Sequence, residues 1–395
     1  MRALVVAGLV VFHSAVVFAA GTSWFVKDPR PGAGFTVFLL WGSLWGMPLL
    51  FLVAGMAARH ALRTRPPAAF ARERLARLGI PFVTGLLVLV PPMFYLARLG
   101  RPGSAGPYWL FWLRFVNIPA IAGGLLVRGS WRSGGAGFDP AHLWFLYVLL
   151  VFSLALAPLS GYLARSGAVR LAGRYPATAL AAAAVPMMVT EAVFGPDVNT
   201  GGWERLAYAF PFGVGFVIAG DPRFEPALRR FRWRALAIAL PATIGLVAWA
   251  AALAASGSDV TGGGVPGWSA LQGLAGWAWM VAILGSAASA AGRVRPRPGR
   301  PASAEAPGGW RRRAGGYMTE AVLPFYLLHE PVIVAIAWLV VRWHAPVLAR
   351  YPVLIVVSFA ITLTVYELAV RRFRVTRFLF GMRPRRRLMN TAGGG

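Results

Sequence analysis

The sequence predicts an all-α protein that crosses a membrane about ten times, with both termini in the cytoplasm. The chain has 395 residues, of which 57% are hydrophobic and only 13% charged; this composition is typical of a polytopic membrane protein. It contains ten apolar stretches, most of them close to the roughly 20 residues that an α-helix needs to cross the hydrocarbon core. Its basic residues cluster between these stretches, on alternate sides.

The ten predicted spans contain several Gly and Pro residues, which membrane helices tolerate where neighbouring helices satisfy the backbone. The sixth span is shorter than the others. In chain order the spans cover 3–20, 36–57, 79–97, 142–162, 176–196, 206–220, 235–255, 268–291, 318–341 and 352–370.

The orientation follows from the distribution of arginine. With a cytoplasmic N-terminus, the cytoplasmic segments hold 30 of the 40 basic residues, and the inverted orientation would place this excess on the wrong side. The cytoplasmic segments are the N-terminus, 58–78, 163–175, 221–234, 292–317 and 371–395. We therefore expect localisation in the cytoplasmic (inner) membrane of the cell.

The net charge of +27 would indicate a nucleic-acid partner in a soluble protein. Here the arginines flank membrane spans, which indicates orientation and contact with anionic lipids, so we expect membrane lipids and no nucleic acid as partners. The absence of cysteine excludes disulfides and thiolate metal sites. No zinc, Walker, dinucleotide or nucleophile-elbow motif occurs, and we expect no metal and no bound cofactor.

The connections and ends of the chain carry further predictions. The 98–141 segment is long and apolar in part, so it is expected to lie in the interface or to re-enter the protein. The 292–316 segment is rich in Pro, Arg, Gly and Ala, which predicts a disordered linker. Residues 1–375 are assigned to one membrane domain and 376–395 to a basic, disordered cytoplasmic tail. A cleaved signal peptide is the alternative for the first span, but a histidine within the apolar run favours an uncleaved helix.

Arg2 and His13 are eleven positions apart on this first span, so they share one face of a helix and lie about 16 Å apart along its axis. An ionisable residue inside a bilayer is costly and is a functional candidate by default. A neutral imidazole there could take a proton from a hydroxyl that attacks a carbonyl. The alternative is a histidine that hydrogen-bonds a neighbouring helix.

Arg74 and Arg77 precede the third span, three residues apart on one predicted helical face, where they could bind phosphate oxygens. The same spacing recurs elsewhere in this arginine-rich chain, for example at Arg229 and Arg232. Taken by itself, the pair is better interpreted as a topology anchor.

Two further groups of polar and aromatic residues lie in predicted spans. His142 and Trp144 begin the fourth span and are interpreted as part of an interfacial aromatic belt, although they could line a site. Tyr326, His329 and Glu330 lie in the ninth span beside Pro331, where a polar patch at a helix break is expected. His329 and Glu330 are adjacent and point about 100° apart, so they are not expected to pair with each other.

Five segments match a known family in order. They are Arg2-x10-His13, Phe51–Gly55, Arg74-x-x-Arg77 before Leu78 and Pro81, His142–Leu146 and Tyr326–His329. Together they resemble acyltransferase family 3, the integral-membrane acyltransferases that modify sugars and other cell-surface acceptors. Family members often carry a longer polar lead with an acidic residue before the first arginine, whereas this sequence begins at Met1-Arg2. The Val11–Ser14 and Met47–Phe51 segments are similar to the branch that contains a periplasmic glucan succinyltransferase.

The resemblance implies an acyl-CoA co-substrate on the cytoplasmic side and a hydroxyl acceptor, a cell-envelope carbohydrate or a lipid-linked relative. It implies His13 as the catalytic residue and Arg74, Arg77 and Arg2 as acyl-CoA-binding residues. His142, Trp144, Tyr326, His329 and Glu330 are the expected pocket. The alternative function is a transporter or flippase for an anionic lipid or sugar, because buried His and Glu also suit proton coupling.

Overall fold

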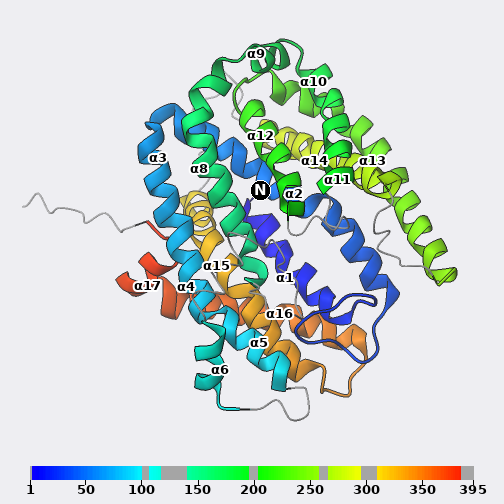
Figure 1. The fold of residues 1–395 in the computed structure, drawn as a ribbon, viewed down its shortest axis with the longest axis vertical. Helices are drawn as coiled ribbons and strands as arrows, with labels where there is room; N and C mark the ends of the chain where they lie inside the picture. The colour runs from blue at the N-terminus through cyan, green and yellow to red at the C-terminus, as the bar shows by residue number, and fades with distance from the viewer. Residues whose placement is uncertain are drawn as a thin grey trace, which may run out of the picture.

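The computed structural model of the protein confirms the all-α fold class. It describes residues 2–99, 106–116, 140–194, 203–257, 266–294 and 309–383, with the side chains of residues 2–5, 203–204, 266, 292–294 and 309–313 excepted. Within these ranges the chain forms helices and turns, and its only extended pairing is an isolated bridge between Ala19 and Gly32. Figure 1 shows the resulting bundle of long helices.

Eight of the described helical segments are long and apolar enough to cross a membrane. They cover Ala33–Thr64, Pro67–Leu99, Ala141–Arg165, Pro176–Phe194, Phe224–Ala255, Gly267–Ala291, Ala314–Val340 and Val347–Val370. Two shorter apolar helices, Val6–Phe18 and Arg205–Ile218, coincide with the first and sixth predicted spans. A membrane protein is thus confirmed, while ten crossings and cytoplasmic termini remain predictions.

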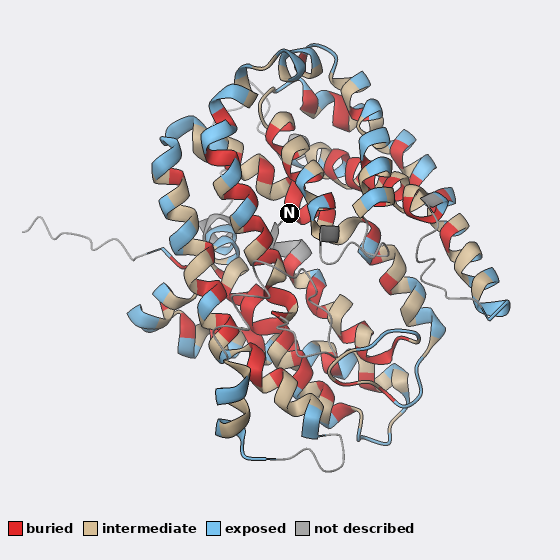
Figure 2. Cartoon of the chain, in the orientation of Figure 1, coloured by how far each residue is buried: buried red, intermediate tan, exposed pale blue. Residues whose placement is uncertain are grey.

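One group of helices forms the largest hydrophobic core of the molecule. It contains α1 (Arg2–Phe18), α4 (Ile80–Val88), α5 (Val90–Leu99), α8 (Trp144–Arg165), α15 (Gly309–Val340) and α16 (Val347–Val365). In this core α1 packs against both α15 and α16. Figure 2 shows the buried residues on the helix faces that turn inward and the exposed residues on the outer faces.

A second group of helices packs on the other side of α2 (Ala33–Thr64), as Figure 1 shows. It contains α9 (Gly167–Arg174), α10 (Pro176–Ala182), α11 (Ala184–Phe194), α12 (Ala209–Ile218), α13 (Phe224–Ala255) and α14 (Pro266–Val294). Leu49 and Leu52 of α2 belong to the core of this second group, whereas Leu50 and Phe51 belong to the first core. The long α2 therefore joins the two groups.

Glycine allows α2 and α12 to cross with their backbones in contact. A side chain at Gly55 would overlap the carbonyl of Phe212, and one at Gly215 would overlap the carbonyl of Leu52. Such close approach by small residues is a common way for membrane helices to pack, because lipid offers no hydrophobic driving force between them. The reciprocal pair fixes α2, and with it the position of Phe51 beside the first core.

Prolines in these helices release carbonyls that side chains of other segments then use. Proline has no N–H, so the carbonyl four residues earlier loses its helical donor. In α5, Pro91 frees the carbonyl of Leu87, and Trp112 Nε1 donates to it at 2.8 Å. This bond attaches α6 (Tyr108–Phe115), whose Trp109 is exposed, to the end of α4, where α5 begins.

The basic region around Arg77 has an irregular backbone. Helix α3 (Pro67–Arg74) continues into a π-helical turn, η1 (Leu75–Gly79), before α4 begins. Single π-helical turns within α-helices occur frequently at functional sites. A second one, η4 (Tyr366–Val370), ends α16 and leads to α17 (Arg374–Leu379), which packs against α4.

Parts of three predicted segments lie outside the described residues. For the 98–141 segment, the structure describes 98–99, α6 with its flanks and residues 140–141, and for the 292–316 linker it describes 292–294 and the start of α15. The first part of the predicted tail forms the end of α17 and its following turn, and residues 384–395 lie outside the description.

Gly215→Ala is expected to destabilise the protein by about 1–3 kcal/mol, because the added methyl group overlaps the α2 backbone and forces the helices apart. The thermal unfolding midpoint of the detergent-solubilised protein measures this. Gly213→Ala on the same helix is the matched control, since nothing lies within 4 Å of a side chain there. Equal midpoints for the two variants would contradict the role of the crossing.

Candidate functional site

The segment between α1 and α2, residues 20–32, folds back over the C-terminal end of α1. Asp28 N donates to Val17 O at 2.9 Å and Gly32 N to Phe18 O at 2.8 Å. Lys27 Nζ donates to the carbonyls of Val16 and Ala19. These bonds satisfy carbonyls that every helix leaves open at its C-terminus, where a cation is also favoured by the helix dipole.

A buried ion pair fixes the same segment to α16. The Asp28 carboxylate accepts a hydrogen bond from the Arg350 guanidinium, and the two residues are 3% and 7% exposed. The guanidinium also lies 5.7 Å from the centroid of the Phe18 ring. The pair connects the segment that follows α1 to α16, which is far away in the sequence. It therefore limits how α1 can shift or rotate.

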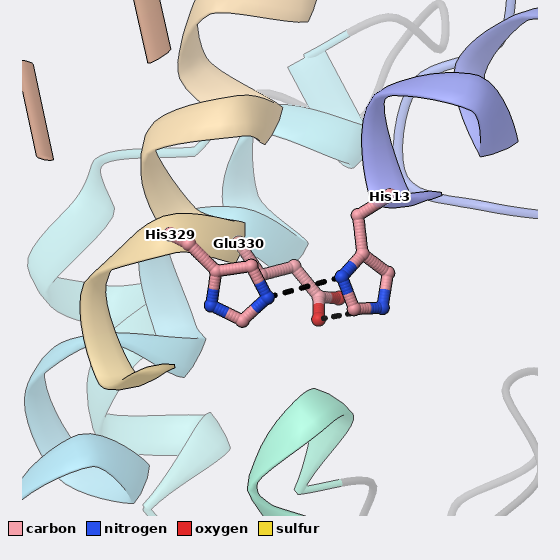
Figure 3. A group of neighbouring side chains, drawn as sticks. All are labelled: His13, His329 and Glu330. Atoms are coloured by element: carbon pink, nitrogen blue, oxygen red, sulfur yellow. Dashed lines mark hydrogen bonds and ion pairs between the residues drawn. The ribbon is translucent and has the colours of Figure 1, made fainter. Parts of the chain in front are cut away.

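His13 lies on α1 with its imidazole turned toward α15, as Figure 3 shows. Its ring centroid is 5.0 Å from that of His329, and the Trp24 ring lies parallel to it at 6.5 Å. The His13 side chain is 20% exposed, whereas those of Glu330 and His142 are 5% and 2% exposed. His13 is therefore the member of this group that another molecule can reach.

The hydrogen bonds of the two histidines fix which nitrogen of His13 is basic. His329 Nδ1 lies 2.6 Å from Tyr326 O, and because a carbonyl only accepts, this nitrogen carries a proton. His329 Nε2 then accepts from His13 Nδ1 at 3.0 Å. In neutral His13 the proton is thus on Nδ1, and Nε2 has the free lone pair of a base.

Pro331 in α15 brings a second histidine into the site. The proline ring leaves the carbonyl of Leu327 without a helical donor. His142 Nε2 donates a hydrogen bond to this carbonyl oxygen at 3.1 Å instead. The hydroxyl group of Tyr326, which also lies on α15, donates a hydrogen bond to the carbonyl of His142. Ala141 precedes His142 with a left-handed φ of 50°, an uncommon conformation for a residue with a side chain.

The carboxyl group of Glu330 lies between the imidazole rings of His13 and His142. Its Oε2 atom is 3.5 Å from His142 Nδ1 and 3.8 Å from His13 Nε2. Glu330 is 4% exposed, and a buried carboxyl group in a membrane bundle needs such polar neighbours. The site thus combines one reachable base with a carboxyl group and two orienting histidines.

The same atoms could hold a divalent cation, since nitrogen and oxygen atoms of His13, His329 and Glu330 lie within 4.8 Å of one another. Two nitrogens bound to one zinc ion would lie about 3.4 Å apart. The 3.0 Å between the two imidazoles fits a shared proton better. The expectation that the site uses no metal remains a prediction.

Of the five predicted pocket residues, the structure brings four together with His13: His142, Tyr326, His329 and Glu330. The belt interpretation is wrong for His142, which is 6% exposed and bonded to α15. Sequence spacing could not show this, because the partner carbonyl lies 185 residues away.

Trp144 is the predicted pocket residue that lies elsewhere. Its ring contacts those of Phe51 and Tyr208 and the guanidinium of Arg205, 5.4 Å away. It supports the packing behind the site. His142 lies in the 3₁₀ turn Ala141–Leu143, whereas Trp144 is the first residue of α8, and the two side chains point in different directions.

The predicted acyl-CoA arginines are placed differently from one another. Arg74 lies over the Phe70 ring at 4.8 Å. Arg77 Nε donates to Gly381 O at 3.2 Å, and its NH1 lies 3.5 Å from Glu73 Oε1. The side chain of Arg2 lies outside the described residues.

Glu73 is the carboxylate that organises this basic region, and the sequence pattern did not single it out. Glu73 pairs with Arg65 as well as with Arg77, and Arg383 NH2 lies 4.0 Å from it. We call Arg65, Glu73, Arg77 and Arg383 the arginine cluster. Arg383 arrives with the C-terminal segment that follows α17, so only the fold connects it with Arg77.

The comparison with protein families identifies a family that matches most of the chain. The family described as "Acyltransferase domain" matches residues 1–367. The chain therefore belongs to acyltransferase family 3 and is an integral-membrane O-acyltransferase. Comparison with curated proteins and with solved structures gives no match. The glucan succinyltransferase branch remains a prediction.

Removing one partner of the Asp28–Arg350 pair leaves a buried charge unpaired, which costs about 3–5 kcal/mol. Asp28→Asn and Arg350→Met are each expected to lower the unfolding midpoint strongly, and the double variant less than their sum. Arg223→Met breaks an exposed pair with Asp221 and should cost about 0–1 kcal/mol. Strictly additive effects of the two buried substitutions would show that the pair does not couple them.

Proposed function

We propose that this O-acyltransferase moves an acyl group from cytoplasmic acyl-CoA to a hydroxyl of a cell-envelope carbohydrate or lipid-linked acceptor, in the cytoplasmic membrane of the cell. The observation that carries the proposal is the 3.0 Å contact between His13 Nδ1 and His329 Nε2, from which Nε2 of His13 is inferred to be the basic nitrogen, on the most exposed side chain of a buried polar cluster. General acid–base catalysis needs a base that can be reached and whose proton-free nitrogen is fixed.

The reaction begins as the acceptor oxygen attacks the thioester carbonyl while His13 Nε2 takes the hydroxyl proton. The tetrahedral intermediate then collapses, the C–S bond breaks, and the leaving thiolate takes the proton back from Nε2. Throughout, the His13 Nδ1–H remains bonded to His329, which keeps the ring in one orientation. This is the role that an orienting group has in catalytic triads.

An acyl-histidine route uses the same nitrogen. In that route Nε2 itself attacks the thioester, and the acceptor then attacks the acyl-imidazole. The unprotonated Nε2 suits both routes, so both remain within the proposal.

The arginine cluster supports the donor half of the proposal. Arginine binds phosphate oxygens in a bidentate way, and CoA carries several phosphate groups. Glu73 holds guanidinium groups from three separate segments close together, and one carboxylate leaves this group with net positive charge. Arg74 lies next to it in sequence, at the start of the π-helical turn η1.

His13→Ala is expected to lower the transfer rate by at least about 10²-fold, the usual contribution of a general base. The assay is transfer of a labelled acyl group from acyl-CoA to product in membranes. Mass spectrometry of envelope glycans and lipids from a deletion strain, with and without the gene restored, identifies the acceptor.

His344→Gln is the control for the His13 variant, because His344 is exposed and remote from the site. Both variants should reach the membrane in equal amounts. Full transfer activity in His13→Ala would refute the catalytic assignment.

Arg74→Gln/Arg77→Gln is expected to raise the KM for acyl-CoA about tenfold or more, with a smaller change in kcat. The reason is that these residues bind phosphates far from the reacting bond, and uniform binding affects KM. The matched control is Arg229→Gln/Arg232→Gln, which removes an arginine pair with the same spacing from α13. An unchanged KM in the first variant, or equal increases in both, would exclude the phosphate role.

A further inference from the structure

The proton count around Glu330 is the feature that the proposed function leaves unexplained. His142 donates from Nε2 to Leu327 O, so in its neutral form the other ring nitrogen, Nδ1, has a lone pair. That lone pair faces Oε2 of Glu330 at 3.5 Å. Two lone pairs that face each other at low dielectric repel, so a proton on either atom is required for this arrangement to be stable.

We infer that Glu330 and His142 share one proton, and that this shared proton lets the site supply a negative charge to His13 at the moment when His13 becomes protonated. The inference rests on the proposed role of His13 as base. Glu330 is the connecting group, because the same oxygen also lies 3.8 Å from His13 Nε2.

The proton movements balance over one turnover. When His13 Nε2 takes the acceptor proton, the shared proton moves onto His142 Nδ1, and the Glu330 carboxylate then lies between two imidazolium rings. When the thiolate takes the proton from His13, the shared proton moves back toward Glu330. The group formed by His13, His142 and Glu330 therefore gains one proton and then loses it. Whenever His13 is positively charged, the Glu330 carboxylate lies beside it.

The other titratable groups around Glu330 do not perform this role. On α15, His329 uses Nδ1 for Tyr326 O and Nε2 for His13. The Tyr326 hydroxyl on the same helix donates to His142 O. From α1 and from the 3₁₀ turn Ala141–Leu143, the groups that face the carboxyl are His13 and His142. Glu330 and His142 are thus positioning residues for the charge on His13.

The test uses three variants: Glu330→Gln, His142→Gln and the double variant. Glutamine at 330 retains the size of the side chain but cannot become negative. Glutamine at 142 can still donate to Leu327 O but lacks the basic Nδ1. The measured quantity is the kcat of acyl transfer as a function of pH, since a purely structural defect would lower kcat without moving the profile.

Opposite shifts are expected for the two single variants. Glu330→Gln should move the acid limb of the profile to lower pH by about 1 unit, because protonated His13 loses its adjacent carboxylate. His142→Gln should move it to higher pH by a similar amount, because the second imidazolium ring, which opposes protonation of His13, is then absent while the Glu330 carboxylate remains. The double variant should behave like Glu330→Gln, since no carboxylate remains to respond.

Glu225→Gln and His344→Gln are the matched controls, because both residues lie far from the site, and they should leave the profile unchanged. Shifts in the same direction, or no shift, for the two single variants would overturn the shared proton. If His142→Gln does not fold, the shift measured for His142→Asn, compared with that for Glu330→Gln, tests the shared proton.

An active His13→Ala variant would instead contradict the proposed catalytic role of His13. Failure of the proposed function can therefore be distinguished from failure of the shared-proton inference.

Discussion

The site depends on one carbonyl that α15 cannot use for its own helix. Pro331 removes the donor that would bond Leu327 O, and a carbonyl left unpaired inside a membrane bundle is costly. His142 satisfies it, which attaches the turn before α8 to the middle of α15. The same bond assigns the proton of His142 to Nε2, so that Nδ1 faces Glu330. One proline thus determines both a helix contact and the protonation pattern of the site.

A second chain of contacts fixes His13 from the opposite direction. Segment 20–32 bonds the last carbonyls of α1, and the Asp28–Arg350 pair connects this segment to α16. With the end of α1 fixed, the His13 ring meets His329 at hydrogen-bond distance. The chemistry therefore relies on polar contacts that membrane burial makes strong, because broken polar contacts find no water to replace them.

Much of the architecture could be predicted from periodicity, length and charge. The segment Phe51–Gly55, which the sequence comparison with the family singled out, has two physical roles. Gly55 permits the crossing of α2 and α12, and Phe51 fills the first hydrophobic core. His13 could be selected as a candidate site residue from the sequence, because an ionisable residue in an apolar helix is costly unless it has a function or a polar partner. Glu73 could not, because a glutamate among cytoplasmic arginines resembles any solvated charge until Arg65 and Arg383 are brought to it.

The sequence by itself determined the helical class, the presence of helices long and apolar enough to cross a membrane, and the occurrence of His13, Tyr326, His329 and Glu330 as polar residues within apolar helices, since hydropathy and the cost of buried charge are local properties. Only the tertiary structure decided that His142 belongs with them, that Trp144 does not, and which nitrogen of each imidazole holds its proton. These outcomes depend on hydrogen bonds between residues up to 316 positions apart, and no local pattern encodes the distance between two helices.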